Sequence, residues 1–176
     1  MRYAKIRQMD ISNGEGVGVS LFVQGCHFHC RGCFNQETWD FNGGKEFTSQ
    51  TARTLFSLID RPYIQRVSIL GGEPLCDENV SMVYQLIKEI KYRFPDKKIW
   101  LYTGYNFDEI MKRGNTKEST PWNTRMKAVL SVHVVVDGQF QLENQDLFNE
   151  HIVFAGSTNQ RIIRIEDLLD HEMFAN

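Results

Sequence analysis

Residues 17–35, VGVSLFVQGCHFHCRGCFN, join an apolar and β-branched run to a loop that carries three of the four cysteines of the chain. The run Val17–Val23 is typical of a buried strand. Cys26, Cys30 and Cys33 follow it in the spacing C-x3-C-x2-C, which lets a short loop turn several thiolates toward one point. Iron–sulfur clusters and zinc ions are held in this way. Three thiolates leave one position of a cubane cluster or a tetrahedral ion open for chemistry.

The length and charge of the chain limit the class of protein. The 176 residues fit one domain with a real apolar core, so we expect a single domain over residues 1–176. The 20 basic and 22 acidic residues give no basic excess for a nucleic-acid partner. No apolar run approaches ~18 residues, and Met1–Ile6 lacks the apolar core of a signal peptide. We therefore expect a cytoplasmic protein with reduced thiols and no membrane partner.

Outside the cysteine loop, short apolar runs alternate with helical patterns. We expect strands at 67–70, 98–102 and 129–136, with weaker candidates at 152–154 and 161–163. We expect helices at 48–59 after the N-cap Thr48, at 79–93 and at 107–113, an exposed loop at 114–123, and a helical turn over 166–174. This order predicts an α/β fold of mainly parallel strands with right-handed crossovers.

Unusual loops follow the predicted strands. Besides the cysteine loop, these are Gly71-Gly72-Glu73, Thr103-Gly104-Tyr105 and Asp137-Gly138. The C-terminal ends of parallel strands gather on one rim, where ligands bind, so we expect the four loops to form one site. The glycines allow close backbone approach to a polar ligand, and a carboxylate or carbonyl at Glu73 can accept hydrogen bonds from an ammonium group.

A zinc site is the rival interpretation of the cysteines. Cys26, Cys30 and Cys33 would then be completed by His27, His29 or Cys76. Two features disfavour zinc, since structural zinc usually takes two separated pairs of ligands and this loop ends a strand, where substrate sites form. We assign neither histidine to metal. Cys76 is expected to be a small buried apolar residue, with a role as fourth ligand or redox thiol as the alternative.

Further motifs accompany the cysteines and glycines between about residue 10 and residue 161. They are Asn13-Gly14-Glu15-Gly16, Ser20–Cys26, Cys33-Phe34-Asn35, Leu70–Leu75, Tyr102–Tyr105, Val136–Gly138 and Gly156–Arg161. With them the chain resembles the radical S-adenosylmethionine enzymes, and among these the activating proteins of the anaerobic ribonucleoside-triphosphate reductase. Gly32 departs from the wider superfamily, in which the residue before the third cysteine is commonly aromatic. The activating proteins resemble this chain in having a small residue there and an aromatic one, here Phe34, after the cysteine.

The resemblance implies a fold and a set of cofactor contacts. The fold is a partial, open βα barrel of the radical S-adenosylmethionine type. Cys26, Cys30 and Cys33 would bind three irons of one [4Fe-4S] cluster, and the fourth iron would take the amino nitrogen and carboxylate of S-adenosylmethionine. Gly71, Gly72 and Glu73 would line the methionine end, and the backbone around Gly32, Cys33 and Phe34 the adenosyl end. Thr103 and Asp137 are second-rank candidates on the same rim.

The resemblance also implies a reaction. One electron would cleave S-adenosylmethionine, and the 5′-deoxyadenosyl radical would take a hydrogen from a glycine of the large reductase subunit. No catalytic residue beyond the cluster and the S-adenosylmethionine site is expected. The implied partners are that subunit and a low-potential electron donor such as flavodoxin. The alternatives are a small-molecule radical enzyme such as a 7-carboxy-7-deazaguanine synthase, and a non-catalytic zinc-binding module. Gly156–Arg161 favours the activating protein.

Overall fold

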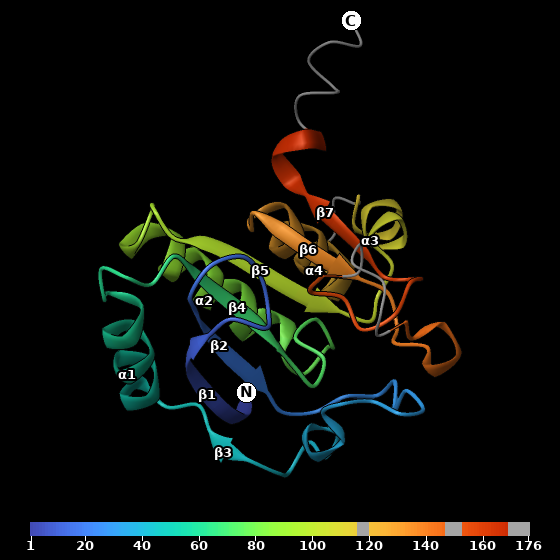
Figure 1. Cartoon of the computed structure of the whole chain (residues 1–176), viewed down its shortest axis with the longest axis horizontal. Helices are drawn as coiled ribbons and strands as arrows, with labels where there is room; N and C mark the ends of the chain where they lie inside the picture. The colour runs from blue at the N-terminus through green and yellow to red at the C-terminus, as the bar shows by residue number, and fades with distance from the viewer. Residues whose placement is uncertain (116–119, 147–152, 169–176) are drawn as a thin grey trace, which may run out of the picture.

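The protein folds around one seven-stranded sheet with the strand order β3-β1-β2-β4-β5-β6-β7. The structure, a computed structural model, describes residues 1–115, 120–146 and 153–168 (Figure 1). The four middle strands are parallel: β2 (Gly18–Val23), β4 (Arg66–Gly71), β5 (Lys98–Thr103) and β6 (Val134–Asp137). The outer strands β1 (Arg2–Asp10), β3 (Lys45–Glu46) and β7 (Arg161–Arg164) pair antiparallel. The α/β prediction with mainly parallel strands is therefore confirmed for the middle of the sheet.

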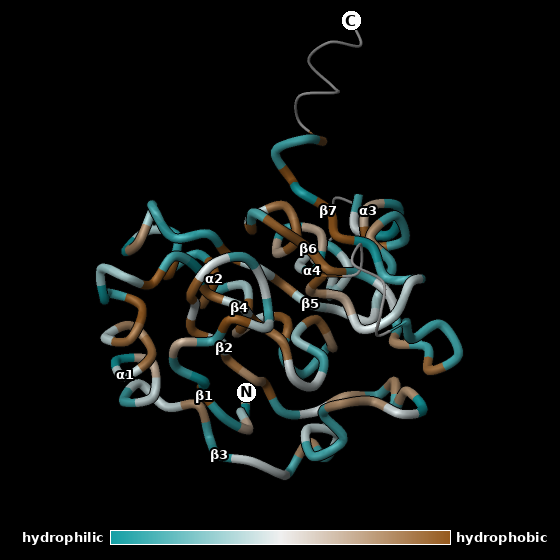
Figure 2. Tube along the Cα trace, in the orientation of Figure 1, coloured by the Kyte–Doolittle hydropathy of each residue, from teal (hydrophilic) through white to brown (hydrophobic). Residues whose placement is uncertain are grey.

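The helices cover one face of this sheet. They are α1 (Ser49–Ile59), α2 (Val80–Arg93), α3 (Phe107–Gly114) and α4 (Pro121–Leu130). Val19, Leu21 and Val23 of β2 are fully buried in the core that these helices share with the strands. Because side chains alternate along a strand, Ser20 and Phe22 point to the opposite face. Figure 2 shows the hydrophobic colour along the central strands and the hydrophilic colour on the outer loops.

The ends of α1 and α2 follow from their sequence. The Thr48 hydroxyl accepts a hydrogen bond from the backbone N–H of Thr51, whose own hydroxyl accepts the backbone N–H of Thr48, so the two form a capping box. Helix α2 stops at Arg93, two residues before Pro95, which cannot continue a helix. Within the described ranges, none of the helices combines the length and apolar character that a membrane crossing needs.

Helix α4 shows where the sequence prediction was wrong. The stretch 114–123 was expected to be a loop and 129–136 a strand, whereas the structure has a helix over Pro121–Leu130 and a strand that begins only at Val134. Residues 116–119 of the expected loop lie outside the described residues. The last turn of the helix and the strand are both apolar and only three residues apart. That continuous apolar run concealed the turn between them.

The start of α4 carries signals that the prediction did not use. The Thr120 hydroxyl accepts the backbone N–H of Asn123 at 3.2 Å, and Pro121 occupies the first turn, where its fixed φ suits a helix. Its buried face includes the polar residues Asn123 and Arg125 beside Ala128 and Val129. The apolar periodicity is therefore weak, and this explains why a polar loop was predicted.

The C-terminal predictions have mixed outcomes. The strand expected at 161–163 is confirmed as β7. The strand expected at 152–154 is wrong for Val153 and Phe154, which lie in a turn, and residue 152 is outside the described residues. Of the helical turn expected over 166–174, the structure describes a helical conformation at Ile165–Leu168, and the remainder lies outside the described residues.

Loops cover the face of the sheet opposite the helices. The loop of residues 11–17, between β1 and β2, lies across β4 in Figure 1. A Cβ added to Gly14 would lie 2.8 Å from the Trp100 ring and 2.9 Å from Arg66, and its φ of +128° is a conformation that glycine alone adopts readily. This loop therefore packs closely on the face of the sheet opposite the helices.

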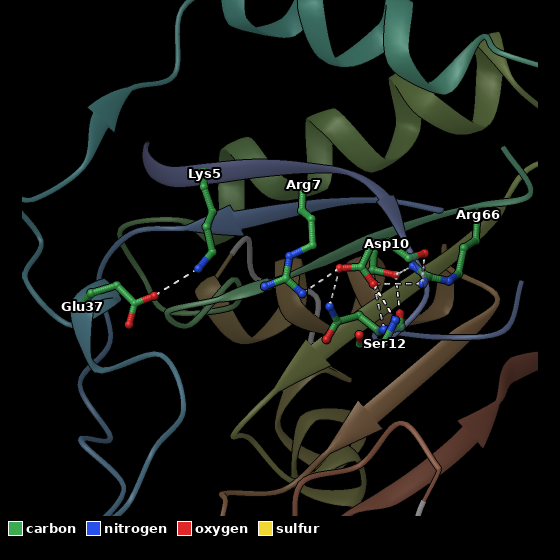
Figure 3. A network of polar contacts seen from close by, with 8 residues as sticks. Lys5, Arg7, Asp10, Ser12, Glu37 and Arg66 are labelled. Atoms are coloured by element: carbon green, nitrogen blue, oxygen red, sulfur yellow. Dashed lines mark hydrogen bonds and ion pairs between the residues drawn. The ribbon is translucent and has the colours of Figure 1, made fainter. Parts of the chain in front are cut away.

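A buried ion pair holds the same loop in place (Figure 3). The Asp10 carboxylate is fully buried and accepts from Ser12 N–H at 2.8 Å, Asn13 N–H at 3.0 Å and Arg66 Nη2 at 3.1 Å. Burial alone raises the pKa of Asp10, but the hydrogen bonds from Asn13, Ser12 and Arg66 outweigh it and hold the pKa below its ordinary value. Arg66, 1% exposed, also donates to Ser68 Oγ at 2.6 Å.

Asp10→Ala is expected to destabilise the fold by about 3–5 kcal/mol, because it leaves the buried guanidinium of Arg66 without its carboxylate. Denaturant unfolding measures this loss. Glu89→Ala is the control, since it removes the exposed partner of Arg93 and is expected to cost about 0–1 kcal/mol. Equal losses in the two variants would show that the Asp10 pair does not hold the loop.

Candidate functional site

The loops that follow β2, β4, β5 and β6 lie at the same end of the sheet (Figure 1). They surround a cavity of about 470 Å³. The convergence expected from the strand ends is therefore present. The predicted site residues that line this cavity are Cys26, Cys30, Cys33, Phe34, Gly71, Gly72, Glu73 and Thr103.

Two predicted site residues, Gly32 and Asp137, are not among the residues that line the cavity. Gly32 has a φ of +76° and turns the chain between the second and third cysteines. Asp137 is 1% exposed and accepts hydrogen bonds from Phe107 N–H at 2.7 Å and from Arg161 Nη2 at 2.5 Å. Asp137 therefore ties α3 and β7 to the end of β6, and Gly138 lines the cavity in its place.

The glycine loop after β4 contacts the backbone of the cysteine loop. Gly72 N–H donates to the Val23 carbonyl at 2.9 Å, and Glu73 N–H donates to the Gly25 carbonyl at 2.7 Å. A Cβ added to Gly72 would lie 2.4 Å from that Gly25 oxygen. The close backbone approach predicted for this glycine exists, but the neighbour in the structure is the cysteine loop itself. Contact between this loop and S-adenosylmethionine stays a prediction.

Glu73 joins the loops after β4 and β5. Its side chain is buried, and its carboxylate accepts from Thr103 Oγ1 at 2.7 Å, Gly104 N–H at 2.7 Å and Leu75 N–H at 2.8 Å. Burial raises the pKa of Glu73 to about 7, against the opposing effect of these donors. The described contacts give Glu73 and Thr103 a positioning role, and their direct contact with a cofactor stays a prediction.

The raised pKa of Glu73 predicts a pH-dependent stability. The folded state binds the proton of Glu73 more tightly than the unfolded state does. The protonated carboxyl therefore adds to the free energy of unfolding, fully below about pH 4.5, and this stabilisation is lost as the pH rises to about 7. The shift corresponds to about 3 kcal/mol. Thermal unfolding between pH 5 and pH 8 should show this decline in the native chain and a shallower one in Glu73→Gln. A constant difference between the two across this range would contradict the prediction.

The three thiols of the cysteine loop are free and chemically suited to iron. Cys26 is buried, whereas Cys30 and Cys33 are partly exposed, and Cys33 Sγ accepts Asn35 N–H at 3.4 Å. Burial raises the pKa of the Cys26 thiol to about 11 and also raises that of Cys30. A metal must therefore displace the protons of these thiols when it binds.

The three thiols that line the cavity supply the donor set of an iron–sulfur cluster. Across the described ranges, no three His, Cys, Asp or Glu side chains form a group that could hold one metal ion. In a [4Fe-4S] cubane each thiolate binds a different iron, so three thiolates along one cavity wall match its donor chemistry. The residues present therefore fit a [4Fe-4S] cluster.

The remaining candidate ligands lie elsewhere. His27 Nε2 lies 2.9 Å from Glu78 Oε1, and the His29 ring stacks on the Trp39 ring with centroids 4.6 Å apart. Cys76 is fully buried outside the cavity lining, and burial raises the pKa of its thiol. The structure therefore places it as the small buried residue that was expected.

Sequence reasoning named Phe34 for this site but missed Phe28, Phe140 and the basic residues Lys5 and Arg7, which also line the cavity. Phe34 is 64% exposed and packs against Phe140 with ring centroids 5.1 Å apart. Phe28, Trp39 and Tyr102 line other parts of the wall, and β1 contributes Lys5 and Arg7. The two-residue spacing of Lys5 and Arg7 signals a shared strand face, but the register with β2 was needed to show that this face borders the cavity.

The sequence matches the family described as the 4Fe-4S single cluster domain over residues 12–163. This family model assigns a [4Fe-4S] cluster to the chain. The chain is also similar to proteins named anaerobic ribonucleoside-triphosphate reductase-activating protein. Identity is 35% to that of Enterobacteria phage T4, over 92% of this chain and 93% of the relative. The relative from Escherichia coli K12 is 35% identical over 91% of this chain and 96% of its own length. The relative from Vibrio cholerae is 34% identical over 93% of this chain and 98% of its own length. With this identity along nearly the whole of each sequence, the chain belongs to the family of the anaerobic ribonucleoside-triphosphate reductase-activating proteins.

Proposed function

We propose that the chain activates an anaerobic ribonucleoside-triphosphate reductase by creating a radical on a glycine of its large subunit. The observation that carries the proposal is the position of the three cysteines. Cys26, Cys30 and Cys33 line one cavity that the loops after β4 and β5 also line. The names of the relatives supply the partner.

Three thiolates, those of Cys26, Cys30 and Cys33, would hold the cluster, and this leaves one iron free for S-adenosylmethionine. When bound, the two cofactors supply one-electron cleavage of a carbon–sulfur bond, as expected of an enzyme of the radical S-adenosylmethionine type. Gly71 and Gly72 present backbone without side chains to the methionine end. Glu73 and Thr103 hold that loop against the end of β5.

The adenosyl end is assigned to the segment around the third cysteine. Gly32 supplies the turn, and the backbone of Cys33 and Phe34 borders the cavity. The Phe34 and Phe140 rings form an apolar wall that helps to exclude water from the reacting groups. Asp137, which is outside the lining, contributes by fixing Gly138 and the start of α3.

The fold is interpreted as an open barrel in one domain of residues 1–176. The position of the cavity on the face away from the helices supports this interpretation, as does the loop of residues 11–17 at one end. The free thiols favour a reducing cytoplasm. A low-potential donor such as flavodoxin is proposed because the chemistry needs one electron.

Anaerobic reconstitution tests the function. The reduced, cluster-loaded protein is mixed with S-adenosylmethionine and the large reductase subunit, and electron paramagnetic resonance is recorded. A glycyl radical is expected. S-adenosylmethionine cleavage without a glycyl radical would favour the small-molecule alternative. A colourless protein with one zinc and no cleavage would reject radical chemistry altogether.

A further inference from the structure

Two cations of strand β1 lie on the cavity face of the sheet. Lys5 pairs in register with Phe22 of β2, and Arg7 with Ser20. Lys5 Nζ lies 4.7 Å from the centroid of the Phe22 ring, and Arg7 Cζ lies 5.0 Å from it. Lys5, Arg7 and Phe22 all line the cavity that the three cysteines line. Figure 3 shows the two cationic side chains extending from β1 in the same direction.

The positive charge of Arg7 is incompletely neutralised. Arg7 Nη1 donates to Asp10 Oδ2 at 3.1 Å, and in the described part of the chain its other N–H groups have no hydrogen-bond partner. The same Asp10 carboxylate also binds Arg66, so two guanidinium groups share one negative charge. The Arg7 side chain is 45% exposed and can therefore donate to a further acceptor.

Lys5 has a partner that an incoming group can replace. Its Nζ binds Glu37 Oε1 at 3.2 Å, and both side chains are about half exposed. An exposed pair of this kind contributes little stability, so exchange of Glu37 for another carboxylate costs little. Glu37 belongs to the 3-10 turn Gln36–Thr38, which directly follows the cysteine loop. Lys5 is thereby held beside the segment where the radical chemistry is proposed.

We propose that Lys5 and Arg7 form a subsite for a carboxylate of the polypeptide that carries the target glycine. The inference rests on the proposed function and specifies how the protein substrate is recognised. The carboxylate belongs either to an acidic side chain near the glycine or to the C-terminus of the substrate chain. Arg7 and Lys5 bind it by charge-assisted hydrogen bonds, while the buried Phe22 ring keeps the two cations at a fixed height above the sheet.

The test separates substrate recognition from cofactor chemistry. Reconstituted native protein, Lys5→Gln, Arg7→Gln and the double variant are assayed for S-adenosylmethionine cleavage without the reductase and for the glycyl radical at increasing concentrations of the large subunit. Cleavage is expected to be unchanged. The subunit concentration for half-maximal radical should rise roughly tenfold or more for each lost cation, and Arg7→Lys should restore part of the loss.

Arg93→Gln is the matched control. Arg93 also pairs with one carboxylate, that of Glu89, and also lies over an aromatic ring, that of Phe56, at 5.1 Å. It does not line the cavity. This variant should keep the native half-maximal concentration. In Arg7→Gln the Asp10 carboxylate still accepts hydrogen bonds from Arg66 and from three donors of Ser12 and Asn13, so this variant should fold. Lys5→Gln removes only the exposed ion pair with Glu37 and should fold as well.

Altered substrates identify the source of the carboxylate. In one set of subunit variants, each Asp or Glu near the target glycine is changed to its amide, and in the other the chain ends in a C-terminal amide. Neutralising the bound carboxylate should raise the subunit concentration for half-maximal radical with the native enzyme. It should cause no further rise with the Lys5→Gln, Arg7→Gln double variant, which no longer binds that carboxylate.

Two results would overturn the inference: an unchanged half-maximal concentration in the double variant, or a parallel loss of S-adenosylmethionine cleavage, which would assign the cations to the cofactor. The proposed function fails separately, through the absence of a glycyl radical in the native enzyme.

Discussion

Replacing any one of Cys26, Cys30 or Cys33 by alanine is expected to reduce S-adenosylmethionine cleavage to the background rate. Each thiolate is assigned to a different iron, so the loss of one leaves the cluster with two protein ligands and two open positions. The measurement is iron content and visible absorption after anaerobic reconstitution, followed by quantification of 5′-deoxyadenosine.

Cys76→Ala is the control for the cysteine variants. Cys76 is buried outside the cavity lining, so its replacement removes only a small apolar side chain. This variant should keep its cluster and much of the cleavage activity. If Cys76→Ala lost the cluster while one of the other three variants retained it, the assignment of the ligands would be wrong.

Gly72→Ala is expected to abolish cleavage as well, for a steric reason. The new Cβ would lie 2.4 Å from the Gly25 carbonyl oxygen and 3.0 Å from that of Thr38, and both are backbone atoms. The loop after β4 would have to move away from the cysteine loop, which breaks the hydrogen bond from Glu73 N–H to Gly25. Overpacking of this kind costs about 1–3 kcal/mol.

Thermal unfolding and cleavage together test the Gly72 prediction. Gly156→Ala is the comparison, because its new Cβ would approach only side-chain atoms, those of Phe140 at 3.0 Å and Gln160 at 3.2 Å. At these distances the side chains need to shift by only a few tenths of an ångström, so Gly156→Ala should lose less activity and less stability. A Gly72→Ala protein that cleaves S-adenosylmethionine at the native rate would show that the contact between the two loops is not needed.

The predictable part of the fold is the part that local patterns determine. The strand over residues 18–23 follows from its continuous apolar run. Helix α1 follows from its helical spacing of apolar residues and from the N-cap Thr48. Helix α4 was missed because its buried face includes Asn123 and Arg125. Arg125 is stabilised there by contacts that are distant in sequence, a hydrogen bond from its Nε to the Leu75 carbonyl at 2.7 Å and the Tyr105 ring, and sequence spacing does not reveal them.

The candidate site divides in the same way. The three cysteines and the glycine loop could be found from their spacing and from the strands before them. The internal partners of Glu73 and Asp137 could not, because they depend on which strands are neighbours. Lys5 and Arg7 were missed for that reason too, since β1 lies across the sheet from the loops after β5 and β6.

The loop of residues 11–17 limits how a protein substrate can reach the cavity. Held by Asp10 and packed on Trp100, this loop contributes Ser12 and Asn13 to the cavity lining. The cavity, of about 470 Å³, has room for only a short piece of polypeptide beside the cofactors. The target glycine therefore has to be presented at the tip of a turn or close to a chain terminus, and a glycine inside a strand or helix of the partner must first be released from it.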